Sequence, residues 1–538
     1  MRLLWIGVLS LAIGCGSPEI SVSIDAVRLA EHVRVLSSDE FGGRGPGTPG
    51  EDRTVDYLAE QFEAAGAAPA AEDESYFQTV PLVGVESLAT TTATWDGGAL
   101  AWLDDVVAVN HQQLDSAAIT AEVVYVGRGI VAPEFGWDDY KDVDVQGKLV
   151  LLFTNEPPSN DDAFFGGRGL TYYGRWTFKY VEALRHGAAG VLIVHTDETA
   201  GYLWSVVRNS WGGKNPYVKL GDDEPALVAA GWIQGPAALS ILQQSAATRG
   251  KTVEEILGLA NEKDFRPIAL DASATLNISS RVTPLNTRNV LAKIPGANPA
   301  EAVLYTAHWD HLGTNDDPDG DGIYNGAVDN ATGCAALIEL ARAFAQLPEP
   351  PARTILFAAV GAEEGGLRGS EYYAQHPVIP VGKTAVDLNY DGLLPLPETR
   401  DAALPGYERT TLKPLVEQLA AEFDYTLNPE AHPEQGYYYR SDHFSLAKAG
   451  VPAFSLKLGT DVIGQPAGWG EEQEQEYRDN RYHQPADEFD PSWDFAGLAK
   501  LVRFGFELGR RVAEQPDLPT WVEGDEFLPA RERSWGDR

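Results

Sequence analysis

Four apolar runs in the second half of the chain constrain the fold most, because polar residues follow each of them. The runs 303–307, 354–360 and 384–388 lead into acids or histidines, and 451–458 leads into a glycine-rich loop. From Asn289 onward, helical stretches alternate with such strand-like runs. This alternation predicts an α/β domain with a mixed, largely parallel central sheet flanked by helices. Ligands of an open α/β sheet bind beyond the carboxyl ends of its strands, so these polar residues are expected to meet in space.

The polar residues at these positions are of the types that bind zinc. They are His308 and Asp310 after the first run, Glu363 and Glu364 after the second, Asp391 after the third, Asp329 at a loop-to-helix junction, and His483 in a later loop. Any one of them is more commonly a solvated surface residue. Together, histidines and acids gathered at strand ends suit a borderline metal such as zinc.

Five ordered motifs resemble those of the M28 family of metallopeptidases. They are Ala307–Asp310, Val328–Gly333, Glu363–Glu364, Asn389–Asp391 and Tyr482–Asp487. Asn325–Ala327, Arg440–His443 and the glycine-rich segment Arg44–Gly50 also match the family pattern. The resemblance covers nearly the whole chain after the first residues. It implies a zinc exopeptidase fold and an enzyme that releases N-terminal amino acids from peptides with a free N-terminus.

The resemblance also implies a role for each matching residue. The implied ligands of two zinc ions are His308, Asp329, Glu364, Asp391 and His483, with Asp329 bridging the ions. Glu363 would be the general base toward a water that the zinc pair activates. Asp310 would orient the ring of His308, and Asp487 would do the same for His483.

Between the two parts of the expected peptidase, the chain changes to short β-rich runs. Residues 140–148 and 186–191 resemble a protease-associated domain, which would be inserted at 106–280. The expected organisation is a leader at 1–15, an N-terminal part of the peptidase at 20–105, the insert at 106–280, the catalytic domain at 281–515 and a polar surface tail at 516–538.

The first 15 residues read as an export signal. Arg2 precedes a short apolar run, Leu3–Ile13, and small residues follow it. Leu11–Cys15 resembles a lipobox that would place a lipid on Cys15, although Ala12 stands where leucine is usual; an ordinary cleavage site is the alternative. We expect an exported protein, lipid-anchored or periplasmic in a bacterial envelope, or extracellular. The net charge of −38 opposes binding to nucleic acid and to anionic lipid.

Two further sites are expected from local patterns. Asp317, Asp319 and Asp321 stand at every second position, with Pro318 and Gly320 between them, as in the first part of a calcium loop, but Val328 stands where an EF-hand has its closing glutamate. Tyr438 and Tyr439, with Asp442, are expected to line a substrate pocket, although aromatic clusters more often pack in cores.

Three other functions remain open. Glutaminyl cyclases share the fold but are transferases that work with one zinc ion, whereas this chain carries the full five-ligand set. Carboxypeptidases of the same family usually carry a long helical segment after the last ligand. A binding protein without catalysis would not need an intact ligand set.

Overall fold

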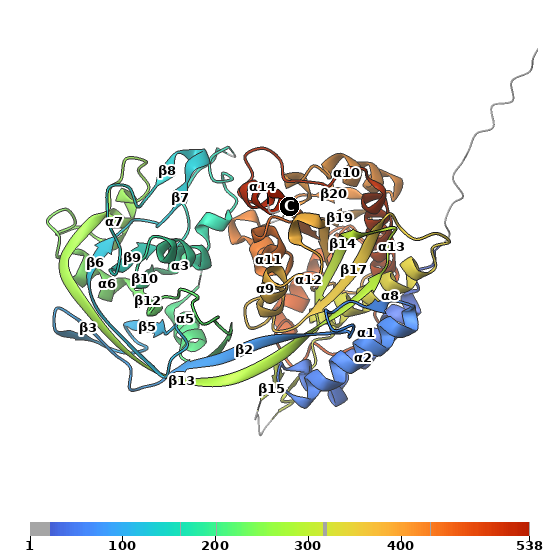
Figure 1. Ribbon diagram of the computed structural model, residues 1–538, viewed down its shortest axis with the longest axis horizontal. Coiled ribbons are helices and arrows are strands. Elements are labelled where there is room, and N and C mark those ends of the chain that lie inside the picture. Colours follow the sequence, from blue (N-terminus) through green and yellow to red (C-terminus); the bar gives the residue numbers. More distant parts are fainter. Residues whose placement is uncertain (1–21, 162, 201, 316–319, 431, 537–538) are drawn as a thin grey trace, which may run out of the picture.

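The computed structural model describes residues 22–161, 163–200, 202–315, 320–430 and 432–536 (Figure 1). The expected leader and Cys15 lie outside these residues. Among the helices that the structure describes, none is both long and apolar enough to cross a membrane.

The part of the chain expected to be the peptidase, termed the peptidase part, is built on parallel strands in the order β21-β18-β14-β17. These strands are β14 (Asn298–His308), β17 (Arg353–Val360), β18 (Thr384–Asn389) and β21 (Ala453–Ser455). Beyond β17, strand β13 (Ile268–Ile294) is antiparallel to it, and β2 (Phe77–Ser87) is antiparallel to β13. The prediction of a mixed, largely parallel sheet is confirmed.

Helices cover both faces of this sheet. One face packs against α1 (Ala26–Leu36), α2 (Pro49–Ala65), α8 (Thr332–Ala345), α10 (Lys413–Glu422) and α13 (Ala496–Glu514). The other face packs against α9 (Arg368–Gln375), α11 (His443–Lys448) and α14 (Leu528–Gly536). Within β14, Val303 and Tyr305 join the first core while Leu304 joins the second, because successive strand side chains point to opposite faces.

A second part of the molecule, the insert, extends the same sheet. Its strands are β3 (Thr92–Trp95), β4 (Gly98–Leu100), β5 (Val106–Val109), β6 (Ser116–Tyr125), β9 (Leu149–Phe153), β10 (Gly190–His195) and β12 (Ala229–Gln234). Its helices include α3 (Trp176–Arg185), α5 (Trp204–Trp211), α6 (Gly235–Leu242) and α7 (Val253–Leu259). β3 and β4 belong to this sheet, and Ala93 and Trp95 lie in its core, so the insert begins before the expected residue 106.

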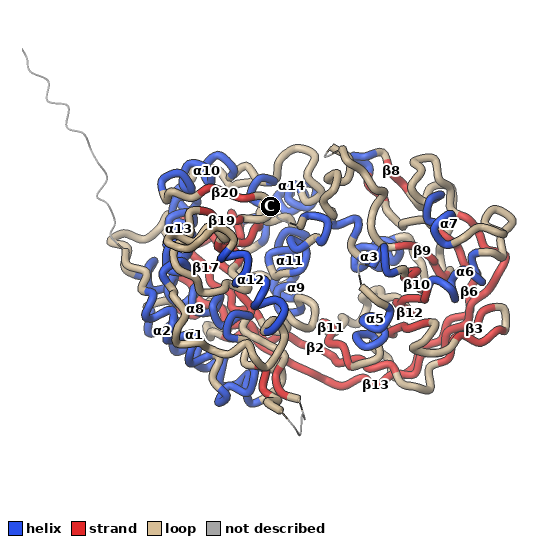
Figure 2. The backbone as a smooth tube through the Cα atoms, turned by 180° about the vertical axis from the view of Figure 1, so that it is seen from behind, coloured by secondary structure: helices blue, strands red, loops and turns tan. Residues whose placement is uncertain are grey.

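Strand β13 joins the two parts without a break. It has 27 residues; Val290–Ile294 pair with β17 in the peptidase, whereas Ile268–Ser279 pair with β6 in the insert. β2 pairs with the stretch Ser280–Val290 between them. Figures 1 and 2 show β2 and β13 running side by side from one part to the other.

The C-terminal segment makes a second junction between the parts. The Glu526 carboxylate accepts hydrogen bonds from Arg409 Nη2 (2.7 Å) and the Tyr439 hydroxyl (2.8 Å) in the peptidase, and from the Tyr172 amide (3.0 Å) in the insert. Trp521 and Arg531 are buried. The segment expected to be a polar surface tail therefore contributes to the core.

The remaining short elements lie mostly in connections. They are β1 (Ala68–Pro69), β7 (Val131–Ala132), β8 (Trp137–Asp138), α4 (Asp197–Ala200), β11 (Lys214–Val218), β15 (Gly313–Thr314), β16 (Ile323–Tyr324), β19 (Asp401–Ala403), β20 (Thr426–Asn428), β22 (Lys457–Leu458) and α12 (Trp469–Asn480).

Candidate metal centre

The polar residues that follow the parallel strands meet at one edge of the peptidase sheet. His308 is the last residue of β14, Glu364 follows β17, and Asp391 follows β18. Asp329 lies in the turn that leads into α8, and His483 lies in the loop after α12. All five residues with implied ligand roles thus come from turns or strand ends around a single site.

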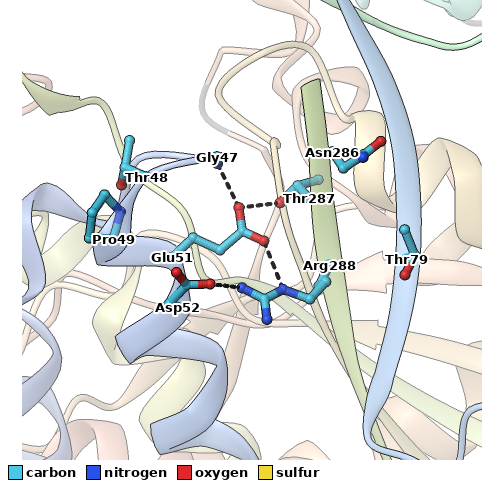
Figure 3. A pocket seen from close by; sticks show the side chains of 9 residues that line it. All are labelled: Gly47, Thr48, Pro49, Glu51, Asp52, Thr79, Asn286, Thr287 and Arg288. Carbon is cyan, nitrogen blue, oxygen red and sulfur yellow. Dashed lines mark hydrogen bonds and ion pairs between the residues drawn. The ribbon is translucent and has the colours of Figure 1, made fainter. Parts of the chain in front are cut away.

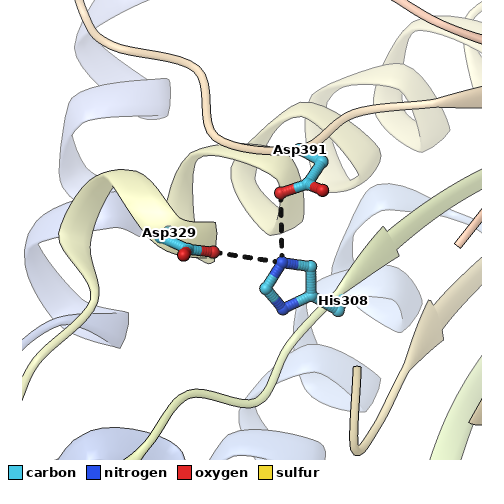
Figure 4. Close-up of side chains that lie close together, drawn as sticks. All are labelled: His308, Asp329 and Asp391. Carbon is cyan, nitrogen blue, oxygen red and sulfur yellow. Dashed lines mark hydrogen bonds and ion pairs between the residues drawn. The ribbon is translucent and has the colours of Figure 1, made fainter. Parts of the chain in front are cut away.

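Two groups of donor atoms share Asp329. His308 Nε2 lies 3.1 Å from Asp329 Oδ1 and 3.1 Å from Asp391 Oδ1 (Figure 4). His483 Nε2 lies 3.3 Å from Asp329 Oδ2 and 3.1 Å from Glu364 Oε2. The two oxygens of one carboxylate therefore face two different imidazoles, as a bridging ligand requires. Imidazole and carboxylate donors in this arrangement fit two zinc ions.

His311 is also close to this centre, although the family pattern does not use it as a ligand. It is buried, and its Nδ1 lies 2.7 Å from Glu364 Oε1. One ring nitrogen of His311 and carboxylate oxygens of Asp329 and Glu364 lie within 4.8 Å of one another, so these three could also hold an ion. His483 contacts both carboxylates directly, whereas His311 contacts only Glu364. In the sequence, the only sign of this proximity is that His311 stands three residues after His308 in the motif His308-Trp309-Asp310-His311.

Two acids expected to orient the histidine rings instead hold the backbone of the ligand-bearing turns. His308 Nδ1 contacts the backbone carbonyl of Asp310 at 3.1 Å, and the Asp310 carboxylate is 3.9 Å away. That carboxylate accepts hydrogen bonds from the amides of Glu363 (3.0 Å) and Glu364 (3.4 Å). Asp487 likewise accepts from the amide of Asp329 at 3.1 Å. Both acids are satisfied by amides, which explains why neither carboxylate reaches an imidazole.

Glu363 differs from its neighbours because no hydrogen bond holds its carboxylate among the described residues. Burial raises its pKa well above the ordinary value; His308 opposes this shift, while the carboxylates of Glu364 and Asp391 add to it. A carboxylate whose pKa is raised toward neutrality can accept and return a proton during a reaction. Glu363 is thus a buried carboxyl at the metal centre whose proton affinity is raised, and its role as general base stays a prediction.

Zinc binding to the metal-free protein is expected to release about two protons at pH 7. Burial lowers the pKa of His483, but Asp329 and Glu364 raise it to about 10; the pKa of His308 is also raised well above its ordinary value. Both imidazoles must lose a proton before they can bind zinc, so the apparent affinity should rise with pH up to about 10. Calorimetric titration with zinc in buffers of different ionisation enthalpy measures the protons released. Binding without proton release would contradict this assignment of the ligands.

The residues expected to line a substrate pocket do not face solvent. Tyr438 and Tyr439 are 5% and 6% exposed, and Asp442 is fully buried. The Tyr438 hydroxyl donates to the Ala453 carbonyl at 2.9 Å, and the Tyr439 hydroxyl donates to Glu526. These aromatic side chains pack into the junction with the C-terminal segment, and their role with Asp442 in lining a substrate pocket stays a prediction.

The calcium prediction stays a prediction. Asp317 and Asp319 lie outside the described residues. Asp321 is exposed, and its Oδ1 accepts a hydrogen bond from the Ile323 amide at 2.9 Å.

A separate pocket of about 510 Å³ shares no residue with the metal centre (Figure 3). Glu51 lies in its wall and accepts hydrogen bonds from the Gly47 amide (2.6 Å), the Thr287 hydroxyl (3.1 Å) and Arg288 Nε (3.1 Å). These bonds tie the start of α2 to β13. The Glu51 carboxylate and the Arg288 guanidinium in the pocket wall are engaged in these bonds, so we do not assign the reactive site to this pocket.

Comparison with known proteins agrees with this chemistry. Residues 289–502 match the model of peptidase family M28. Leupeptin-inactivating enzyme 1 of Streptomyces exfoliatus is 30% identical over 203 residues, covering 37% of this chain and 42% of that enzyme. An aminopeptidase of Pseudomonas aeruginosa is 25% identical over 386 residues, covering 70% of this chain and 58% of the relative. The matches thus span less than two thirds of either relative's length.

A solved structure of similar extent is the aminopeptidase from Aneurinibacillus sp. strain AM-1. It superimposes with a TM-score of 0.48 at 21% identity, over 92% of this chain and 96% of that chain.

Proposed function

Since residues 289–502 are of the M28 metallopeptidase type, we propose that this protein is a zinc aminopeptidase that releases N-terminal amino acids from peptides. The observation that carries the proposal is the placement of Asp329, whose two carboxylate oxygens each face a different histidine. His308 and Asp391 would complete the protein ligands of one zinc ion, and Glu364 and His483 those of the other.

When bound, two zinc ions would supply an acidified water and a Lewis acid for the peptide carbonyl. Glu363 would take a proton from the attacking water and return it to the leaving amine. The Asp310 carboxylate holds the Glu363 amide, so the base stays at the edge of the sheet beside His308. Carboxylates of the centre would also attract the positive α-amino group of the substrate. This attraction would restrict cleavage to N-terminal residues.

The enzyme is expected to cleave a peptide with a free N-terminus and to spare its N-acetylated counterpart, because acetylation removes the charge that the carboxylates attract. Release of free amino acids from the two otherwise identical peptides measures the preference, with a chelator-treated sample as the control. We expect a difference of at least about 100-fold, the loss of one charge-assisted contact of roughly 3 kcal/mol. Efficient cleavage of the acetylated peptide would refute the aminopeptidase assignment.

Assays on the same purified protein distinguish the proposed aminopeptidase from the other functions that the sequence leaves open. Cyclisation of an N-terminal glutaminyl peptide would indicate a cyclase, and release of C-terminal residues would indicate a carboxypeptidase. Bound zinc without turnover of any peptide would indicate a binding protein.

The location and the insert are parts of the same proposal. Export to the bacterial envelope or the medium rests on the leader sequence, and mass spectrometry of the mature N-terminus distinguishes lipid on Cys15 from simple cleavage. The identity of the insert as a protease-associated domain rests on its sequence motifs.

A further inference from the structure

Arg44 is an arginine that the mechanism above does not use, and it is 1% exposed. Its guanidinium donates hydrogen bonds only to backbone carbonyl oxygens, and among the described residues no carboxylate bonds to it or forms an ion pair with it. Nε donates to Trp309 (2.8 Å), Nη1 to Leu36 (2.9 Å) and Asn325 (2.5 Å), and Nη2 to Gly326 (2.7 Å) and Asp329 (3.4 Å). A guanidinium has five N–H donors, so its donor capacity matches these five contacts.

The backbone reaches this position through a left-handed turn. Gly42, Gly43 and Arg44 have φ values of 53°, 62° and 49°. A side chain at Gly43 would come within 2.2 Å of the Gly313 carbonyl oxygen, so glycine is required there. A positive φ is unfavourable for arginine and persists only where surrounding contacts hold it. Here the contacts of the guanidinium hold the turn.

Four of the five carbonyls that Arg44 binds belong to the two segments that supply His308 and Asp329, and the fifth, that of Leu36, ends α1. Trp309 follows His308 directly, and the Asp329 carbonyl is itself an acceptor. Asp487 holds the same turn through a donor rather than an acceptor, because its carboxylate accepts a hydrogen bond from the Asp329 amide. Arg44 and Asp487 therefore fix the backbone of the bridging residue from its carbonyl and amide sides.

Arg44 also places one positive charge among acids. Burial lowers the pKa of its guanidinium, whereas the nearby carboxylates of Asp487, Asp329 and Asp310 raise it. A guanidinium has no lone pair to offer a metal ion, so it can offset the repulsion between these carboxylates without competing for zinc.

We propose that Arg44 is a positioning residue that fixes the spacing of His308 and Asp329, so that the donors of both zinc ions are preassembled. This inference rests on the proposed function. It concerns the retention of metal as well as catalysis, and metal retention can be measured without any substrate.

The test is Arg44→Lys, which keeps the charge but offers three donors on a compact ammonium group. The zinc-loaded variant should release zinc to a chromogenic chelator about 10 to 100 times faster than the natural protein, the range seen when groups that orient metal ligands are removed. We expect kcat to fall by about tenfold and KM to change by less than about threefold, because a displaced site alters the reaction more than the binding of substrate.

The matched control is Arg531→Lys. Arg531 is fully buried and also donates to carbonyls, those of Val381 and Pro519, both at 2.9 Å, in a part of the molecule that supplies no metal ligand. Its zinc release should stay within about twofold of the natural protein. Equal zinc release by the two variants would overturn the role of Arg44. A natural protein that binds no zinc would instead refute the proposed function.

Arg44→Gly provides a second measurement that does not depend on the lysine variant folding. Glycine accepts the positive φ at this position, so the turn can persist without the side chain. Guanidinium ion at about 20 mM, a concentration far below the molar range that unfolds proteins, should slow zinc release from this variant, whereas tetramethylammonium at the same concentration should not. Identical release in both salts would overturn the proposal.

Discussion

Glu363→Gln is expected to lower kcat by about 1,000-fold, within the range for loss of a general base, while the zinc content stays unchanged. Glutamine has nearly the same shape but cannot take a proton from water. Glu363 has no implied ligand role, and its carboxylate makes no hydrogen bond among the described residues, so the exchange should leave the neighbouring ligands in place. Steady-state kinetics on a free peptide together with elemental analysis measure both quantities.

The control for this exchange is Glu408→Gln, which makes the same chemical change at an exposed position outside the metal centre. It should leave kcat and zinc content as they are. Activity of Glu363→Gln within about tenfold of the natural protein would rule out this residue as the base.

Asp329→Ala is expected to have the largest effect on the metal centre, because one carboxylate contributes to both donor groups. The natural protein should hold two zinc ions, and the variant should retain less than about one after gel filtration. His308 would keep only Asp391 as a carboxylate partner, and His483 would keep only Glu364. We expect activity to fall by at least about 1,000-fold, because the remaining donors no longer hold the two ions as a pair.

Asp222→Ala removes an exposed acid in the insert, outside the metal centre and the predicted calcium loop, and serves as the control for Asp329→Ala. Its zinc content should equal that of the natural protein. Two full equivalents of zinc in Asp329→Ala would contradict the bridging role.

The features that could be predicted best from the sequence are those set by the order and the ends of the strands. His308, Glu364 and Asp391 could be placed together because each follows a buried apolar run, and parallel strands deliver their carboxyl ends to one edge of a sheet. The layered α/β architecture followed from the same alternation of strands and helices.

Contacts that depend on packing between distant segments could not be predicted in this way. Tyr439 is buried where the C-terminal segment packs on it, and its hydroxyl donates a hydrogen bond to Glu526, 87 residues later in the chain. The five contacts of Arg44 are to backbone carbonyls, which every residue type offers, so no sequence pattern marks them. The early start of the insert depends on pairing of β3 with a strand that comes more than 150 residues later in the chain.

The uninterrupted course of β13 has a consequence for how the two parts can vary. Side chains along a strand point alternately to opposite faces of the sheet. Every second residue of β13 therefore faces the core in the peptidase part and in the insert alike, with the same alternation in both. A single extra residue near Ser280 would therefore keep the side chains of one end of β13 on their present faces, and would move those of the other end to the opposite face of the sheet. Grafting a different insert onto this fold requires an even change in the length of β13, or a bulge that absorbs the odd residue.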